Sequence, residues 1–323
     1  MAKVVMEKPQ PKKPRRSVAT PSAWELGGLT WVQLGKRLWT SMDSEHDDIF
    51  GRAAELAYYF FLAVFPGLLF LMTVVGLVAG SHPSVRETLF EFTARALPSE
   101  AWDLMQKTIT ETNKAAAGWK LVVGLVGALW SASSGMSSLM TVLNFAYHVK
   151  ERRSWWKSRL LFAPLLTIAL AVLMLGALGI FLFGTAGAAW VGAHGLGGVS
   201  VIAWKVLQWP VALFFVVVAF AVLYYWGPDV KDQKWYWITP GSFIGVLLWA
   251  AASGLFRVYL HFFNSYSATY GSLGAVIVLM LWFYITGIAL LLGAEINSEI
   301  ENAAAERGRA DAKLKGEKEA PAA

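Results

Sequence analysis

Charged residues inside long apolar stretches are the groups in this sequence best suited to do chemistry. Glu55, Arg257 and Glu295 each lie within or at the end of such a stretch. A charge in the middle of a membrane-spanning helix costs about 2.5–3.5 kcal/mol on insertion scales, so residues of this kind are candidates for function. A carboxylate can take up a proton or a cation, whereas a guanidinium stays charged and suits a phosphate.

The two acids belong to a group of polar residues that we expect at the cytoplasmic end of the helix bundle and call the inner polar cluster. Its members are Glu55, Tyr58, Asn144, Tyr147, Glu295 and Asn297. The cluster has two interpretations: a hydrogen-bonded clasp that holds helix ends together, or a site for a substrate or a coupling proton. For Glu55, an interfacial ion pair with Arg52 is a further alternative.

A second group lies toward the outer end of the predicted bundle. Arg257 is about a turn and a half from the outer end of its apolar block, and Tyr266 and Tyr270 follow in the next loop. The block holds no acid. We therefore expect Arg257, helped by Tyr266 or Tyr270, to contact an anionic headgroup at an outer-facing cavity. The alternatives are that Arg257 reaches outward to backbone carbonyl groups or pairs with an acid of residues 81–118.

Proline and small residues shape the helices that would position these groups. Pro66 removes a backbone hydrogen bond within the first apolar block, which predicts a kink or an opened cavity. Gly287 and Gly293 in the last block let a neighbouring helix approach closely. The second block carries small residues at steps of three and four, which permit close packing or line a polar cavity. These residues are Gly124, Gly127, Ser131, Ser134, Gly135 and Ser138.

Motifs of soluble catalysis are absent from the sequence. There is no cysteine, which excludes disulfides and thiolate chemistry, and the five histidines lack metal-ligand spacing. P-loop, His-Glu-x-x-His and Gly-x-Ser-x-Gly patterns do not occur. We therefore predict no catalytic residue, no metal site, no cofactor and no enzymatic activity.

The elements that must position these residues are long apolar blocks. Hydrophobic residues make up 56% of the 323-residue chain and charged residues only 15%, which is too little charge to cover a soluble domain of this size. The blocks lie near residues 54–79, 119–146, 160–186, 203–226, 238–262 and 273–296. Each is long enough, at about 1.5 Å per residue, to cross the roughly 30 Å apolar layer of a bilayer. The sequence therefore predicts an all-α, polytopic membrane protein with six transmembrane helices.

The positions of lysine and arginine predict the orientation of these helices. The loops at 147–159 and 227–237 and the tail after residue 297 carry basic residues, whereas the loops at 187–202 and 264–272 carry none. Basic residues thus alternate between loops, as the positive-inside rule requires, and both termini are predicted to be cytoplasmic. The same bias accounts for the net charge of +6 without a nucleic-acid partner.

The domain organisation follows from these features. Residues 1–34 are predicted to be a basic, disordered tail, 35–300 the membrane domain, and 301–323 a charged C-terminal tail. A short amphipathic helix within 24–50 is expected on the cytoplasmic face. Residues 81–118 are expected to form an amphipathic segment on the outer side.

Four short motifs carry a family resemblance. They are Ala54-Glu-Leu-Ala-Tyr-Tyr59 with Phe65-Pro66, Leu143-Asn-Phe-Ala-Tyr147 followed by Arg152-Arg153, Tyr270-Gly-Ser-Leu-Gly274, and Gly293-Ala-Glu-Ile-Asn297. Together they resemble the YihY/BrkB family over about residues 35–300. The resemblance implies six spans, cytoplasmic termini and a bacterial inner membrane. Family members have carried the label ribonuclease BN, regarded as a misassignment, and others are tied to serum resistance or to lipid A precursor movement; no catalytic role transfers to these residues.

These observations favour a transporter or flippase-like protein for an anionic amphiphile such as a lipid. One alternative is a non-transporting scaffold that docks envelope proteins through residues 81–118. Another is an ion or proton exchanger that uses Glu55 and Glu295, and a nuclease is the least favoured. The expected partners are membrane lipids and, for a scaffold, envelope proteins, with no nucleic acid; the sequence makes no prediction of oligomeric state.

Overall fold

Helices make up most of the described part of the chain. The computed structural model describes residues 23–42, 48–79, 119–193, 197–231, 238–262, 272–309 and 312–314. The α-helices are α1 (Trp31–Met42), α2 (Ile49–Ala79), α5 (Trp119–Ala146), α6 (Ala163–Ala193), α7 (Gly197–Trp226), α8 (Pro240–Phe262) and α10 (Ser272–Glu306). A 3-10 segment, η1 (Ala23–Gly28), precedes α1, and a π-helical segment, η2 (Lys157–Phe162), leads into α6.

The six long helices coincide with the six predicted apolar blocks. Within the described residues, four stretches are long and apolar enough to cross a membrane: Lys157–Ala177, Ile202–Trp226, Pro240–Leu260 and Val276–Glu306. This confirms an all-α protein with membrane-length helices. The six-span topology and the cytoplasmic location of both termini stay predictions.

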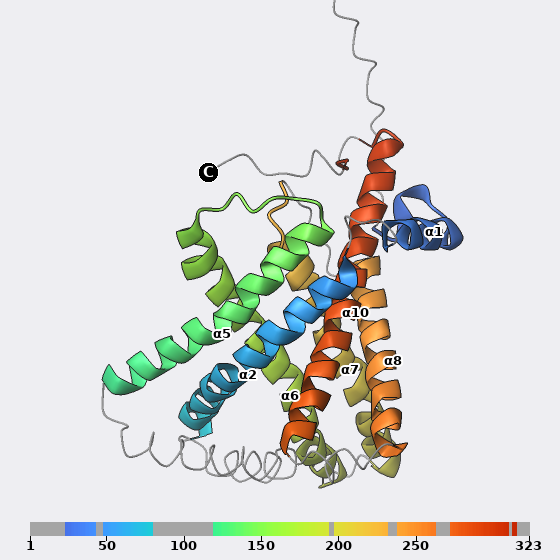
Figure 1. Cartoon of the computed structure of the whole chain (residues 1–323). Coiled ribbons are helices and arrows are strands. Elements are labelled where there is room, and N and C mark those ends of the chain that lie inside the picture. Colours follow the sequence, from blue (N-terminus) through green and yellow to red (C-terminus); the bar gives the residue numbers. More distant parts are fainter. Residues whose placement is uncertain are drawn as a thin grey trace, which may run out of the picture.

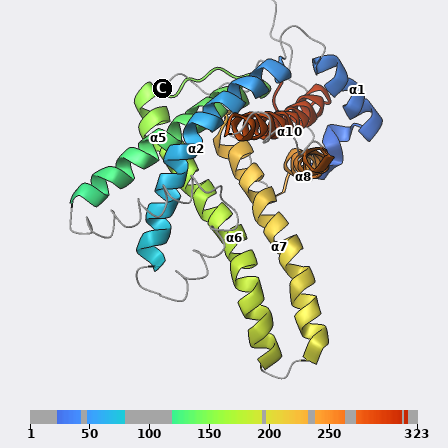
Figure 2. The ribbon, with the colours of Figure 1, turned by 60° about the horizontal axis from the view of Figure 1, so that its bottom comes forward.

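The long helices pack in pairs that meet at one end of the molecule. Helix α2 lies beside α5, α6 beside α7, and α8 beside α10, and Figure 2 shows α6 and α7 projecting together away from the other helices. The main hydrophobic core lies where α2, α6 and α8 begin and where α5, α7 and α10 come to their C-terminal parts. We call this the packed end, and it is the end predicted to face the cytoplasm.

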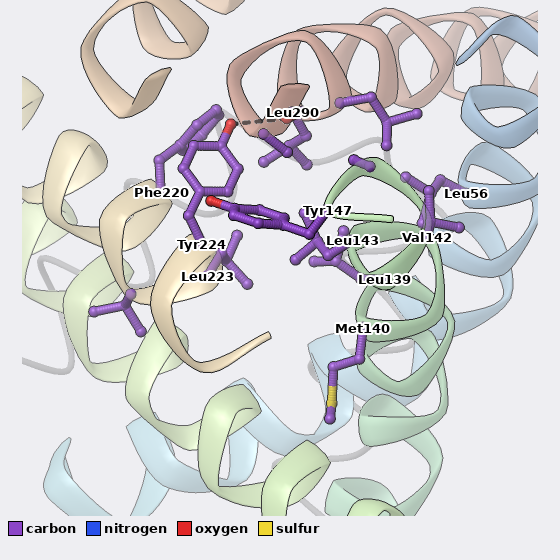
Figure 3. Packing of buried hydrophobic residues seen from close by; sticks show 14 of the residues in the cluster. Leu56, Leu139, Met140, Val142, Leu143, Tyr147, Phe220, Leu223, Tyr224 and Leu290 are labelled. Carbon is purple, nitrogen blue, oxygen red and sulfur yellow. Dashed lines mark hydrogen bonds between the residues drawn. The ribbon is translucent and has the colours of Figure 1, made fainter. Parts of the chain in front are cut away.

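Side chains at the packed end interlock across helices. Figure 3 shows Tyr147, which directly follows α5, beside Leu143 and Tyr224. The Tyr224 hydroxyl donates a hydrogen bond to the backbone carbonyl oxygen of Leu290 on α10, with an O–O distance of 2.8 Å. Burying this hydroxyl is tolerated because the carbonyl satisfies it.

Two glycines of α10 bring its backbone close to neighbouring helices, as the sequence predicts. A methyl group at Gly293 would lie 2.6 Å from the carbonyl oxygen of Gly241 on α8. One at Gly287 would lie 3.2 Å from the Cα atom of Ala53 on α2. The prediction of close helix approach at these positions is confirmed.

The N-terminal region contains a helix within residues 24–50, as expected, but it is more ordered than the tail assignment of residues 1–34 suggests. Residues 23–34, assigned above to a disordered tail, form η1 and the start of α1, and Leu26, Leu29 and Leu34 are buried. Their partners are apolar residues of α10 near and beyond its predicted end at 296, including Ile300. The disordered assignment is therefore wrong for residues 23–34, because the extension of α10 to Glu306 supplies an apolar surface for them.

Candidate functional site

A buried carboxylate lies at the packed end. The Glu295 side chain on α10 is 2% exposed, and the Ser41 hydroxyl of α1 donates a hydrogen bond to its Oε1 atom at 2.9 Å. The Nε2 atom of His148 is 3.7 Å from the same oxygen. His148 follows α5 with a positive φ of 53°, in the left-handed region that few non-glycine residues adopt. Two segments distant in sequence thus converge on one acid of α10.

Two residues after Glu295, Asn297 connects α10 to α8 and to the end of α5. Its Oδ1 atom accepts a hydrogen bond from the backbone N–H of Gly241 at 2.9 Å, and its amide nitrogen donates to the Thr239 hydroxyl at 3.0 Å. The side chain also hydrogen-bonds to Tyr147. Asn297 therefore ties three elements together.

Tyr147 is held in its neutral form. It is 2% exposed, and burial is the main cause that raises the pKa of its hydroxyl well above the usual value. The hydrogen bond with Asn297 acts in the opposite direction, while the negative charges of Glu301 and Glu295 raise the pKa further. Tyr147 is consequently a hydrogen-bonding residue rather than an anion at neutral pH.

Asn144 braces the loops that adjoin this end. Its amide nitrogen donates a hydrogen bond to Glu151 at 2.9 Å, and its Oδ1 atom accepts one from the backbone N–H of Asp229 at 2.6 Å. Arg153 contacts Glu151 and the carbonyl oxygen of Gly227. These bonds connect the loop after α5 with the turn after α7 and have the form of a structural clasp.

Glu55 and Tyr58 lie apart from the other members of the inner polar cluster. Glu55 accepts a hydrogen bond from Arg52, three residues earlier, at 2.9 Å, and among the described residues this is its only ionic partner. Tyr58 is exposed and packs edge-on against Tyr59. Glu55 thus fits the alternative of an ion pair with Arg52. Arg52 also lies over the Phe145 ring, which holds its guanidinium within hydrogen-bonding distance of Glu55.

The predicted outer site and the predicted kink fall mostly beyond the described residues. Arg257 is exposed on α8, while Tyr266 and Tyr270 lie outside the described ranges, as does the 81–118 segment. Pro66 lies within helix α2, in a half whose side chains are not described. The outer anion site and the kink stay predictions.

Sequence reasoning missed three of the residues that build the site. Ser41 shares a helix face with Leu34 and Leu38, at steps of four and three, so the amphipathic pattern of α1 marks it as inward-facing. Thr239 precedes Pro240 and exchanges hydrogen bonds with Ser242, a recognisable helix start. His148 had no signal of its own beyond its position after Tyr147. Within the described residues, no group of three or more histidines and acids could hold a metal ion.

Comparisons with known proteins place the chain among bacterial membrane proteins. It is 36% identical to the ribonuclease-like protein YfkH of Bacillus subtilis over 76% of this chain and 88% of that protein. It is 25% identical to a UPF0761 membrane protein of Alkalilimnicola ehrlichii and 27% identical to one of Xanthomonas oryzae pv. oryzae, over 88% and 83% of this chain. The chain spans 63% and 61% of those two relatives.

The family itself is shown by a match that covers most of the chain. No solved structure matches the sequence. The model of the virulence factor BrkB family matches residues 41–317, a range that includes every residue of the inner polar cluster. Taken with the membrane-length helices and the UPF0761 membrane relatives, this match shows that the chain belongs to the virulence factor BrkB family of membrane proteins.

Proposed function

We propose that this membrane protein moves an anionic amphiphile, such as a lipid, between the two faces of the bilayer. The observation that supports the proposal most directly is the uneven packing of the long helices. Their buried residues gather at the packed end. Apolar side chains of α5, α7 and α8 that lie away from this end are exposed, among them Val126, Ile202 and Leu255. Many membrane transporters work by rocking one group of helices against another around a fixed substrate site.

Helix α5 supplies a polar face that suits this role. The half-buried hydroxyl groups of Ser134, Ser137 and Ser138 each donate to a backbone carbonyl oxygen of the same helix, at 3.2–3.3 Å. Hydroxyls satisfied in this way can lie in an apolar medium and still accept hydrogen bonds. A lipid headgroup could thereby donate hydrogen bonds to these hydroxyl oxygens. After the headgroup leaves, the hydroxyl protons would still be bonded to the helix carbonyl oxygens.

Proton exchange is the second candidate function, and Glu295 is the observation that favours it. A buried acid with a hydroxyl donor and a nearby imidazole is the kind of group that takes part in proton relays within membranes. Glu55 does not join it, so the exchanger would rest on Glu295 and His148 rather than on the two acids together.

Reconstitution of the purified protein in liposomes tests the proposal. The liposomes carry a fluorescent phosphatidylglycerol and an internal pH dye, and RNA is supplied outside. We expect a rise in lipid translocation over protein-free liposomes, with no RNA cleavage. Proton flux through the wild type that disappears in Glu295→Gln, with no lipid translocation, would replace the leading proposal by the second. Folded protein that moves neither lipid nor protons would contradict both proposals.

A further inference from the structure

Arg159 is a guanidinium fixed between two helices. It lies in η2 at the start of the α6 span, and its two terminal nitrogens donate hydrogen bonds to the hydroxyls of Ser137 and Ser134 on α5, at 3.0 and 2.6 Å. The guanidinium carbon is 5.3 Å from the centre of the Trp130 ring, also on α5. Two hydroxyls and an aromatic face thus hold one orientation of the side chain.

The charge of Arg159 is not neutralised within the described residues, where no carboxylate pairs with it. Other arginines of the same end differ, because Arg37, Arg52 and Arg153 each pair with a carboxylate at 2.6–2.9 Å. Ser134 donates its own proton to a carbonyl oxygen of α5 and so only accepts from the guanidinium. A guanidinium has five N–H donors, and the two serine bonds leave the others for a ligand.

The position of Arg159 matches the depth of lipid headgroups. The membrane-length stretch formed by η2 and the start of α6 begins at Lys157, and the half-buried Arg159 lies in its first turn. Trp155 and Trp156, just before it, are 59% and 65% exposed and contact each other edge-on. Tryptophans of this kind gather at the boundary between headgroups and acyl chains. The π-helical turn that carries Arg159 is itself a rare geometry, found often at functional sites.

We propose that Arg159, oriented by Ser134, Ser137 and Trp130, binds the phosphate of an anionic ligand at the packed end of the bundle. A fixed, planar guanidinium with free N–H groups offers the paired hydrogen bonds that a phosphate accepts. The depth of the site favours a phospholipid headgroup over free phosphate. The site shares Ser134 and Ser137 with the polar face of α5 described above, but binding here does not require that the lipid be moved.

Lipid binding to the full-length protein in detergent tests the site. Native mass spectrometry follows titration with phosphatidylglycerol, with a diacylglycerol of the same acyl chains as the phosphate-free comparison. Arg159→Gln should weaken phosphatidylglycerol binding about tenfold or more, as expected for loss of hydrogen bonds to a charged group. Lys157→Gln is the matched control: it removes the same charge from an exposed position two residues away and should change binding less than about threefold.

Two further measurements separate the possible outcomes. The first is protection against thermal unfolding, measured as the melting temperature. If inorganic phosphate raises the melting temperature of the wild type but not of Arg159→Gln, free phosphate is the ligand. If only phosphatidylglycerol raises it, the ligand is the lipid headgroup. If Arg159→Gln does not fold, the double change Ser134→Ala with Ser137→Ala keeps the charge, releases the guanidinium and should still weaken binding. Equal phosphatidylglycerol binding by wild type and folded Arg159→Gln, or by wild type and the double variant, would overturn the site.

Discussion

Glu295 shows how a single acid can be kept inside a membrane protein. Its carboxylate is almost wholly buried, and the Ser41 hydroxyl gives it a hydrogen bond from a helix that lies far away in sequence. A hydrogen bond to a charged group contributes about 1.5–3 kcal/mol, more than a bond between neutral groups. This bond joins α1 to α10, together with the Arg37–Glu306 ion pair and the apolar contacts of Leu34 with α10.

Ser41→Ala is expected to lower the melting temperature of the purified protein, because Glu295 loses a buried donor. Thr40→Ala is the control, since the Thr40 hydroxyl is exposed and, among the described residues, bonds only to the carbonyl oxygen of Lys36 in its own helix. Differential scanning fluorimetry in one detergent compares the two variants. Equal melting temperatures for both would show that the Ser41 bond contributes nothing measurable.

Tyr147 gives a prediction for alkaline pH. Its phenol keeps its proton in the folded protein, whereas an unfolded tyrosine ionises near a pKa of about 10. Stability connected with this group is therefore fully present below about pH 10 and is lost as the pH rises further. Melting temperatures between pH 8 and 11 should fall less steeply in Tyr147→Phe than in the wild type. Tyr58→Phe, at an exposed position, is the control and should follow the wild-type curve. A Tyr147→Phe curve parallel to that of the wild type would show that ionisation of Tyr147 does not limit stability at alkaline pH.

Residue types alone could identify part of this site. Polar residue types at block ends pointed to Glu295, Asn297, Asn144 and Tyr147, all of which form hydrogen bonds at the packed end. Glu55 shared the same signals but lies on a helix face that turns it to Arg52. Which face of a helix points inward depends on packing against other helices, and a uniformly apolar helix carries little record of that in its own sequence.

At the scale of elements, the glycines of α10 determine how closely α8 and α2 approach it. A methyl group at Gly293 would meet the rigid backbone of Gly241, so neither helix could yield without separating. Among the described residues, none comes within 4 Å of the equivalent methyl position at Gly254 on α8. The two glycines thus differ in their surroundings while sharing a helical backbone.

Gly293→Ala should destabilise the protein by about 1–3 kcal/mol, the range for overpacking a close-packed interface. Gly254→Ala should be neutral or slightly stabilising, because alanine favours a helix over glycine. Yield of monodisperse protein and melting temperature report both changes. A Gly293→Ala variant as stable as Gly254→Ala would show that α8 and α10 can shift apart at little cost.

Most element boundaries were predictable, and the exceptions share a cause. The second block was predicted at 119–146, which is where α5 lies, because apolar length is a property of the segment itself. The end of α10 and the order of residues 23–34 were not predictable from apolar length. Residues 23–34 and the end of α10 stabilise one another, because Leu26 and Leu29 pack against Ile300. Neither segment taken alone has a sequence pattern that predicts this contact.

At the scale of the whole molecule, the predicted topology can be tested because the chain has no native cysteine. A single cysteine at Ser158 should be shielded from a membrane-impermeant maleimide in intact cells, whereas one at His194 or Ser267 should react. Permeabilised cells provide the control for accessibility of Ser158. Labelling at Ser158 with no reaction at the other two positions would overturn the six-span arrangement.

The junction of α1 with α10 also has a consequence for the timing of biosynthesis. Ser41 leaves the ribosome 254 residues before Glu295. At a synthesis rate of about 5–20 residues per second, that interval is roughly 13–50 seconds. During it, the apolar side of α1 must rest on the membrane surface or on a chaperone, because its permanent cover has not been made. The final helix to emerge is thus the one that secures the first, and a chain released before residue 295 would carry an unsecured N-terminal helix for quality-control proteases to recognise.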